Sequence, residues 1–542
     1  MRNAVIILLS CAAFLIQCTQ HSTWNAATAP SPVVVECREW SGDEGSLLQV
    51  LDDHAGPLRT LSVTSPANGA VLPLDLAPPL FAWRDGPGAS LWVVSIAAGD
   101  RTCTQVITDR SRWVPDAGLW SAVKRSAGEG ALTVTIHGLD NEHQPVSSAG
   151  LTLRFSADPL DAALFYLEMP LPFSYGEKYP ETFRWRIADP ASEDAPRTVS
   201  RNLPHCSNCH CVSGDGGLLG MDMDIAGDKG GYVLTEISPE IGVSSRSLIS
   251  WNDLQGPSGR KSMGLFSRIS PTNRYVASTV WERSFFAYLD DVWYSQFFFP
   301  IKGALAIYDR DKRSFTPLPG ADAEAVVQTC PDWHPDGRSL VFARARPSQA
   351  LFDVLGDRKV LPTRPTDRIK DLNQQFQLHF DLYRIPFNNG RGGVPEPLPG
   401  ASDNGSSNYF PRHSPDGKWI VFTRSPNGLA IQPGSELWIV PSKGGRARRM
   451  ECNLSPMNSW HSWSPNGRWL AFSSKARGPY TRIYLTHVDE NGLDSPPVML
   501  WRLHSPGYAC VVPELVPRSL LRVRSIALDQ GLRERGGSGR EP

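Results

Sequence analysis

A cluster of cysteines and histidines stands near the middle of the chain, which reads His205-Cys206-Ser207-Asn208-Cys209-His210-Cys211. The spacing Cys-x-x-Cys-His is typical of the attachment site of c-type haem. Two sulfurs at this spacing can bond both vinyl groups along one haem edge, while the next imidazole can ligate the iron. The motif predicts one covalent haem c, with Cys206 and Cys209 as thioether links and His210 as proximal iron ligand.

Two other chemistries use the same residue types. Cysteine and histidine side chains also build tetrahedral zinc sites, so the whole cluster could bind zinc instead. Cys206 and Cys209 could also form a plain disulfide in an oxidising compartment. A histidine directly after the second cysteine, in a chain that begins with an apparent export signal, favours haem over both alternatives.

The second axial ligand is expected close by. Met221 and Met223 are two of only 8 methionines and lie in a strand predicted soon after the motif. A thioether on the iron would raise the reduction potential relative to a second imidazole. The alternatives are His205, or an iron without a nearby second ligand, which would permit ligand chemistry. Met221 also aligns with core phenylalanines of later repeats, which would be a purely structural role.

The N-terminal residues 1–17 are expected to be an export signal, because a basic residue precedes an apolar run. This run is shorter than the ~20 residues that cross a bilayer. The segment Leu15-Ile16-Gln17-Cys18 resembles the bacterial lipobox, so Cys18 is predicted to carry a lipid anchor, although Gln17 replaces the usual small residue. The alternative is secretion after cleavage near Ala27. We expect a cell-envelope protein in the periplasm or outer membrane, with the lipid as its membrane contact.

Composition excludes one class of partner. The 542 residues include 54 Lys+Arg and 55 Asp+Glu, a formal net charge of −1, so nucleic acid is not an expected partner. An exported redox or envelope protein is expected instead. With 41% hydrophobic residues the chain can bury a large core.

Three segments differ from the rest of the chain. Residues 18–57 have no sustained period and are predicted to be a tether. Residues 58–157 contain alternating apolar patches between Gly, Pro and Asp clusters, which predicts a small β-sandwich similar to fibronectin type III or immunoglobulin-like modules. Residues 521–542 are charged and glycine-rich and are predicted to be disordered.

Residues 158–520 repeat a turn followed by an apolar strand, and this repeat predicts an all-β fold. The units are Ser414-Pro415-Asp416-Gly417-Lys418, Ser464-Pro465-Asn466-Gly467-Arg468, and related turns that begin at Ser213, Ser270 and His334. Pro presets the first turn dihedral, Asp or Asn bonds the local backbone, and Gly takes a positive φ, so each unit is a hairpin. A second hairpin after each unit completes a four-stranded blade. The repeat predicts a β-propeller of six blades, with seven as the alternative.

These units closely resemble the TolB-like, WD-like propeller repeats of bacterial exported proteins, over about residues 200–515. More narrowly, segments 206–223, 408–422 and 458–475 resemble TolB-like propeller lipoproteins that carry one Cys-x-x-Cys-His just before the first repeat. The resemblance implies a propeller with a covalent haem. Cys211 departs from the Ser or Thr expected after the histidine and leaves an extra thiol beside the haem.

Together these observations predict an exported monohaem c-type cytochrome that exchanges electrons with an exported partner, because an iron with two protein ligands passes electrons without binding substrate. One alternative is a haem-dependent oxidoreductase that uses the central funnel of the propeller as its active site. Another is a non-redox, protein-binding scaffold. A hydrolase is not expected, since the sequence contains no Gly-x-Ser-x-Gly pentapeptide.

Overall fold

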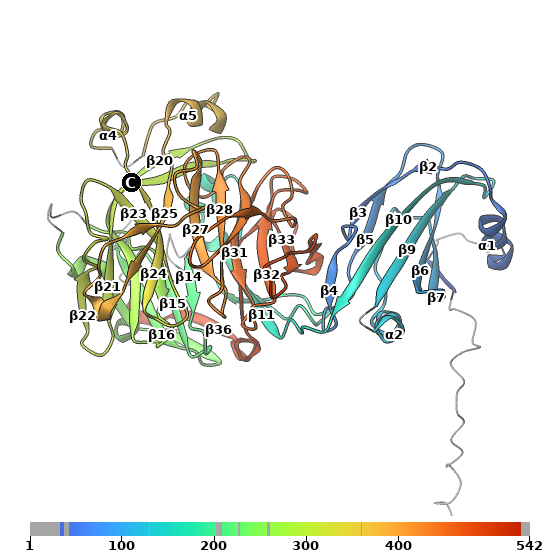
Figure 1. Cartoon of the computed structure of the whole chain (residues 1–542), viewed down its shortest axis with the longest axis horizontal. Helices are drawn as coiled ribbons and strands as arrows, with labels where there is room; N and C mark the ends of the chain where they lie inside the picture. The colour runs from blue at the N-terminus through green and yellow to red at the C-terminus, as the bar shows by residue number, and fades with distance from the viewer. Residues whose placement is uncertain are drawn as a thin grey trace, which may run out of the picture.

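The computed structural model describes residues 33–36, 43–128, 130–201, 203, 209–225, 228–256, 259, 261–358 and 360–532. A smaller N-terminal domain lies beside a larger body of antiparallel sheets (Figure 1). The predicted export signal, the lipid-anchor candidate Cys18 and the motif residues His205 and Cys206 lie outside the described residues. Within the described part of the chain, no helix is long and apolar enough to cross a membrane.

The N-terminal domain consists of two β-sheets with two helices. Its larger sheet has the order β1-β7-β6-β9-β10-β2, and β4 also pairs with β10. These strands are β1 (Val33–Glu36), β2 (Arg59–Thr60), β4 (Val71–Pro73), β6 (Leu91–Ala98), β7 (Arg101–Thr108), β9 (Ala131–Leu139) and β10 (Pro145–Ser156). The smaller sheet contains β3 (Ser62–Ser65), β5 (Phe81–Arg84) and β8 (Arg112–Trp113), and the helices are α1 (Glu44–Asp53) and α2 (Ala117–Ala127).

The two sheets share one apolar core. Alternate residues of β9, Leu132, Val134 and Ile136, are buried in the same cluster as Trp83 of β5, which is the period-2 pattern expected of a strand with one buried face. Strands β1, β2 and β4 pair in parallel with their neighbours. The pairing therefore departs from the purely antiparallel pattern of the fibronectin type III or immunoglobulin-like module that the sequence resembles.

The predicted tether, residues 18–57, contains regular structure and is in this respect not a plain linker. It includes β1 and α1, and α1 begins at a capping interaction in which Asp43 accepts a hydrogen bond from the Ser46 backbone at 2.9 Å. Leu47 is buried against β6 and β7 of the larger sheet. One buried leucine per short helix gives too weak a periodicity to be recognised in the sequence.

The predicted disordered tail, residues 521–542, is also partly ordered. Strand β36 (Ser525–Leu528) pairs in parallel with β17 (Glu240–Val243). Ile526 and Leu528 are buried in the apolar cluster of the larger body. The two strands are far apart in sequence, and the residues around β36 are charged. Neither feature of the sequence therefore predicts this strand.

The larger body consists mainly of four-stranded antiparallel units, two of which are joined into one eight-stranded sheet by a parallel pair between Gly303 and Val327. In chain order they are β14 (His210–Val212), β15 (Leu218–Asp222), β16 (Gly231–Glu236) and β18 (Leu248–Ser250); β19 (Leu265–Ile269), β20 (Tyr275–Tyr288), β21 (Gln296–Asp309) and β22 (Ser314–Pro317); β23 (Val327–Trp333), β24 (Ser339–Ala345), β25 (Asp381–Pro386) and β26 (Glu396–Pro397); β27 (Ser407–His413), β28 (Trp419–Ser425), β29 (Glu436–Pro441) and β30 (Arg448–Arg449); and β31 (Asn458–Trp463), β32 (Trp469–Ser474), β33 (Arg482–His487) and β34 (Val498–Met499). The first two strands of each sheet form the hairpin that the turn motif predicts. Sheets of this kind are consistent with the blades of a β-propeller.

One further sheet combines strands from both ends of this region. Strands β11 (Ala162–Pro170), β12 (Arg184–Ala188) and β13 (Arg197–Ser200) are joined by β35 (Tyr508–Pro517) in the order β13-β12-β11-β35. We call it the closing sheet, because it links the start of the region to its last strand. The short helices α3 (Phe173–Lys178), α4 (Gln349–Leu355) and α5 (Ile369–Gln375) lie in connections between strands.

A repeated backbone irregularity occurs on β19, β23, β27 and β31 and on β35. At each site a non-glycine residue adopts a positive φ between 48° and 61°, and the strand pairing shifts register there. The residues concerned are Phe266, Cys330, Phe410, Trp460 and Val512. Such bulges redirect the side chains that follow them, and side chains that follow Phe266, Phe410, Trp460 and Val512 line the candidate site.

Candidate functional site

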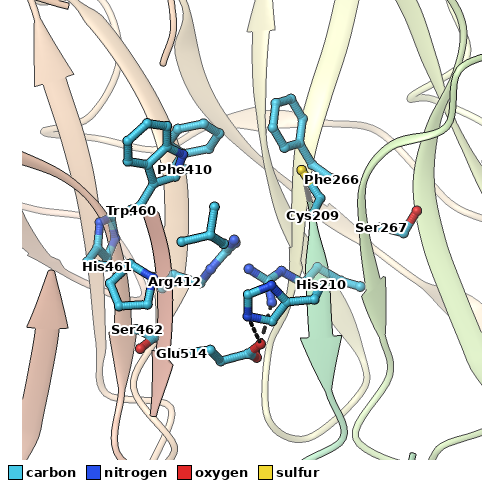
Figure 2. Close-up of a pocket in the computed structure, with 13 residues that line it drawn as sticks. Cys209, His210, Phe266, Ser267, Phe410, Arg412, Trp460, His461, Ser462 and Glu514 are labelled. Carbon is cyan, nitrogen blue, oxygen red and sulfur yellow. Dashed lines mark ion pairs between the residues drawn. The ribbon is translucent and has the colours of Figure 1, made fainter. Parts of the chain in front are cut away.

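The described part of the Cys-x-x-Cys-His motif opens onto a cavity between strands of several sheets. We call it the channel cavity; it has about 510 Å³ of empty space and is lined from β14, β19, β27, β31 and β35. Figure 2 shows an apolar layer that contains Phe266, Phe410 and Trp460. On the other side of the cavity lies a charged layer that includes Arg412 and Glu514. Five strands from different sheets therefore converge on one site.

His210 is the most constrained residue of the motif. Its ring stands edge-on to Phe165 of β11 and Trp185 of β12, with ring centroids 4.7 Å and 4.9 Å away, and the residue is only 2% exposed. Burial, aided by the positive charge of Arg268, lowers the pKa of His210 to about 3. The imidazole is therefore neutral at physiological pH, which is the form that ligates metals.

The ring nitrogens of His210 have no aligned hydrogen-bond partner among the described residues. The polar groups beside the ring are the Phe165 backbone, whose interaction with the imidazole opposes the lowering of its pKa, and the Glu514 carboxylate, whose Oε2 lies 3.3 Å from Nε2. Buried polar atoms are nearly always satisfied, and leaving one unpaired costs about 1–3 kcal/mol. A neutral, unpaired imidazole suits a group that ligates a metal, so His210 fits the predicted haem in this respect.

Cys209 lies on the same cavity as His210. Its carbonyl accepts a hydrogen bond from the Asp222 backbone at 2.9 Å, which ties the motif to β15. Burial raises the pKa of the Cys209 thiol well above its usual range, so the sulfur is protonated. Each cysteine that the structure describes is a free thiol. Cys206, the other predicted thioether link, lies outside the described residues.

Met221 and Met223, the predicted distal ligands, lie near the imidazole of His210. Met221 pairs directly with His210 across β14 and β15, so their side chains stand on the same face of the sheet. Met221 and Met223 are both 1% exposed, in the apolar cluster that contains Phe165 and Trp185. Axial ligands of a haem stand on opposite faces of the porphyrin, whereas Met221 lies beside the imidazole. A methionine distal ligand stays a prediction.

The charged layer is a feature that sequence reasoning missed. Arg268 Nη1 lies 3.6 Å from Glu514 Oε1, and Arg412 Nη1 lies 3.5 Å from Asp332 Oδ1. Burial raises the pKa of Glu514 to about 7, although Arg268 opposes the rise. Arg268, Asp332 and Arg412 each stand two positions before the first residue of a hairpin turn, so repeat register was the signal that could have found them. Glu514 lies on β35, which carries no turn motif.

His461 occupies the same repeat position as His210, three residues before the turn serine. It also lines the channel cavity and is 4% exposed, but its Nε2 donates a hydrogen bond to the Val421 carbonyl at 3.0 Å. Burial lowers its pKa to about 4. The two imidazoles share repeat position and burial, but only His461 forms a well-aligned hydrogen bond to a carbonyl among the described residues, so His461 is a natural control for His210.

Comparison with known proteins finds only distant structural similarity. No protein-family model matches the chain, and no curated protein matches it. Among solved structures, TolB from Acinetobacter baumannii is 15% identical, with a TM-score of 0.39, covering 90% of this chain and 98% of that chain. A putative TolB from Agrobacterium tumefaciens is 15% identical, with a TM-score of 0.34, covering 68% and 94%. The chain, with its four-stranded antiparallel sheets, is thus distantly similar in structure to TolB-like β-propellers.

Proposed function

We propose that this protein is an exported monohaem c-type cytochrome on a TolB-like propeller, which exchanges electrons with an exported partner. The observation that carries the proposal is the Cys-x-x-Cys-His motif, whose described residues Cys209 and His210 face one cavity, with a neutral imidazole that has no aligned hydrogen-bond partner among the described residues. Haem, when bound, supplies one-electron chemistry.

Different residues of the chain would attach the haem, ligate its iron and pack around it. Cys206 and Cys209 would hold the haem covalently, and His210 would ligate its iron. Phe165 and Trp185 fix the plane of the imidazole through their edge-on contacts. The apolar layer limits access of water to the site, and the polarity around a metal centre in turn tunes its potential.

The architecture that carries the site has six blades in this proposal. The sheets that begin with β14, β19, β23, β27 and β31 would form five blades, and the closing sheet the sixth. A lipid on Cys18 would hold the propeller at a membrane of the periplasm or at the outer membrane.

Expression of the whole chain with its own N-terminus, in a bacterium competent for c-type cytochrome maturation, tests the proposal. The exported protein should carry the mass of one haem, stain for haem on a denaturing gel, and show a sharp reduced absorption spectrum. Cys206→Ala and Cys209→Ala together should abolish covalent haem, whereas His461→Gln should keep it. Folded, exported wild-type protein at the mass of the bare polypeptide would refute the proposal.

A haem-linked oxidoreductase is the second candidate, and the charged layer favours it. Simple electron transfer does not require ionisable groups in the cavity, yet Arg268, Arg412 and Glu514 all face it beside Cys209. A five-coordinate, high-spin spectrum and turnover with a dye as electron acceptor would support the enzyme. A six-coordinate, low-spin spectrum without turnover would support the electron carrier.

A further inference from the structure

A second concavity lies between the N-terminal domain and the sheet β31–β34, and it shares no residue with the channel cavity. We call it the junction cleft; it is open to solvent and has about 730 Å³ of empty space. Clefts at domain interfaces are common ligand sites. Its lining residues are Thr64, Ser65, Ala67, Arg84, Leu454, Ala476, Arg477, Tyr484, Pro497 and Met499.

The walls of the junction cleft are held in place by a well-packed contact between the domains. Trp469 and Leu485 of the last sheet belong to the same buried cluster as the core of the N-terminal domain. Arg477 Nη2 donates to the Thr64 carbonyl at 2.6 Å, and the Trp501 ring donates to the Pro78 carbonyl at 3.2 Å. The cleft is therefore preformed, and a ligand would bind without paying for domain closure.

The cleft is electropositive. Its lining contains two arginines and no acidic residue. Arg84 and Arg477 are both exposed, and within the described part of the chain neither guanidinium forms an ion pair. Tyr484 adds a phenol, and burial raises its pKa, so the hydroxyl remains a donor. Hydrogen-bond donors thus dominate the polar side of the cleft.

The rest of the lining is apolar. Leu454, Ala476, Pro497 and Met499 come from the last sheet and its neighbouring connections. A cleft with guanidinium groups on one side and aliphatic side chains on the other fits a ligand that carries one anionic group on an apolar body. Arginine matches the planar, two-oxygen geometry of a carboxylate particularly well.

We propose that the junction cleft binds a small organic carboxylate, with the carboxylate on Arg84 and Arg477 and the apolar body against Leu454 and Met499. The inference does not depend on haem. The site belongs to the rigid contact between the domains, so its occupant would also stabilise that contact, since a ligand that binds only the folded state stabilises it.

Titration calorimetry with benzoate, on purified full-length exported protein, tests the proposal. Benzamide is the matched ligand control, because it has the same ring without the charge. Benzoate should bind and benzamide should not, at equal ionic strength. Arg84→Gln should weaken benzoate binding at least tenfold, the scale of one lost charge-assisted hydrogen bond. Arg446→Gln, at an exposed arginine outside the cleft, should leave binding unchanged.

Two further measurements separate loss of the binding site from loss of folding or of haem. Arg84→Lys keeps the charge but loses the planar fork, so its affinity should fall between the wild type and Arg84→Gln, while the thermal midpoints of all three without benzoate should agree. Protein without haem, made with Cys206→Ala and Cys209→Ala, should bind benzoate as the wild type does. Equal binding of benzoate and benzamide, or no loss of binding in Arg84→Gln, would overturn the proposal, whatever the haem content proves to be.

Discussion

The buried imidazole of His461 should make the stability of the protein depend on pH. Its surroundings lower its pKa to about 4, from 6.5 for a free imidazole, and burial is the main cause. The unfolded chain takes up a proton near pH 6.5, but the folded chain resists protonation until about pH 4. Its contribution to stability is therefore fully present above pH 6.5 and is lost as the pH falls toward 4.

The size of the effect follows from the two pKa values. Each pH unit below 6.5 favours the unfolded state by about 1.4 kcal/mol. At pH 5 the interval is 1.5 units, so His461 should cost about 2 kcal/mol relative to pH 8. His461→Gln removes the titrating group and keeps an N–H that can donate to the Val421 carbonyl. The variant should therefore lose about 2 kcal/mol less than the wild type between pH 8 and pH 5.

Urea titrations followed by tryptophan fluorescence, for both proteins at both pH values, measure this double difference. The comparison at pH 8 alone reports how well glutamine replaces the hydrogen bond. The comparison between the two pH values reports only the titration. If both proteins lost the same free energy between pH 8 and pH 5, the imidazole would be solvated in the folded state, and the burial of His461 described above would be wrong.

Two further substitutions test the packing of the interior. Trp469→Ala should lower the free energy of unfolding by about 3–5 kcal/mol, because removal of a fully buried indole at the domain junction leaves a cavity. Calorimetry would measure the loss, with Trp293→Ala at an exposed tryptophan as the control. A loss for Trp469→Ala as small as that for Trp293→Ala would contradict the prediction. Burial raises the pKa of Glu282 to about 7, so its contribution is present below about pH 4.5 and is lost as the pH rises through 7. Glu282→Gln should gain roughly 2–3 kcal/mol on the wild type between pH 5 and pH 8 in the same urea titrations, and a constant difference would contradict the assignment.

The hairpins of the larger body could be predicted because turn chemistry is local. Gly417 and Gly467 take φ values of 71° and 69° in their turns, as a residue without a Cβ can. The closing sheet could be anticipated only as a need to complete the ring. The partners β11 and β35 come from opposite ends of the region, and strand pairing over such a distance leaves no local trace in either sequence.

The candidate site, like the fold, was predictable only where its signal is local in the sequence. The spacing of Cys209 and His210 carries a chemical meaning by itself, so the motif stood out. The charged layer did not, because each blade-like sheet contributes at most one member of it and no short segment contains two. Bulges at positive φ, on residues such as Phe266 and Trp460, direct the neighbouring side chains into the cavity. Nothing in the type of those residues predicts such a backbone conformation, which glycine normally favours.

The motif and the closing sheet are physically coupled. His210 stands on the first strand after the closing sheet, and the rings against it, Phe165 and Trp185, belong to that sheet. The nearest carboxylate, that of Glu514, is on β35, which pairs with β11 only when the last strand of the region has docked. The surroundings of the imidazole are therefore complete only when β35 is paired with β11. A change on β35 that weakens its pairing should disturb His210, although the two are far apart in sequence. The redox properties proposed for this chain would then depend on assembly of the closing sheet as well as on the motif.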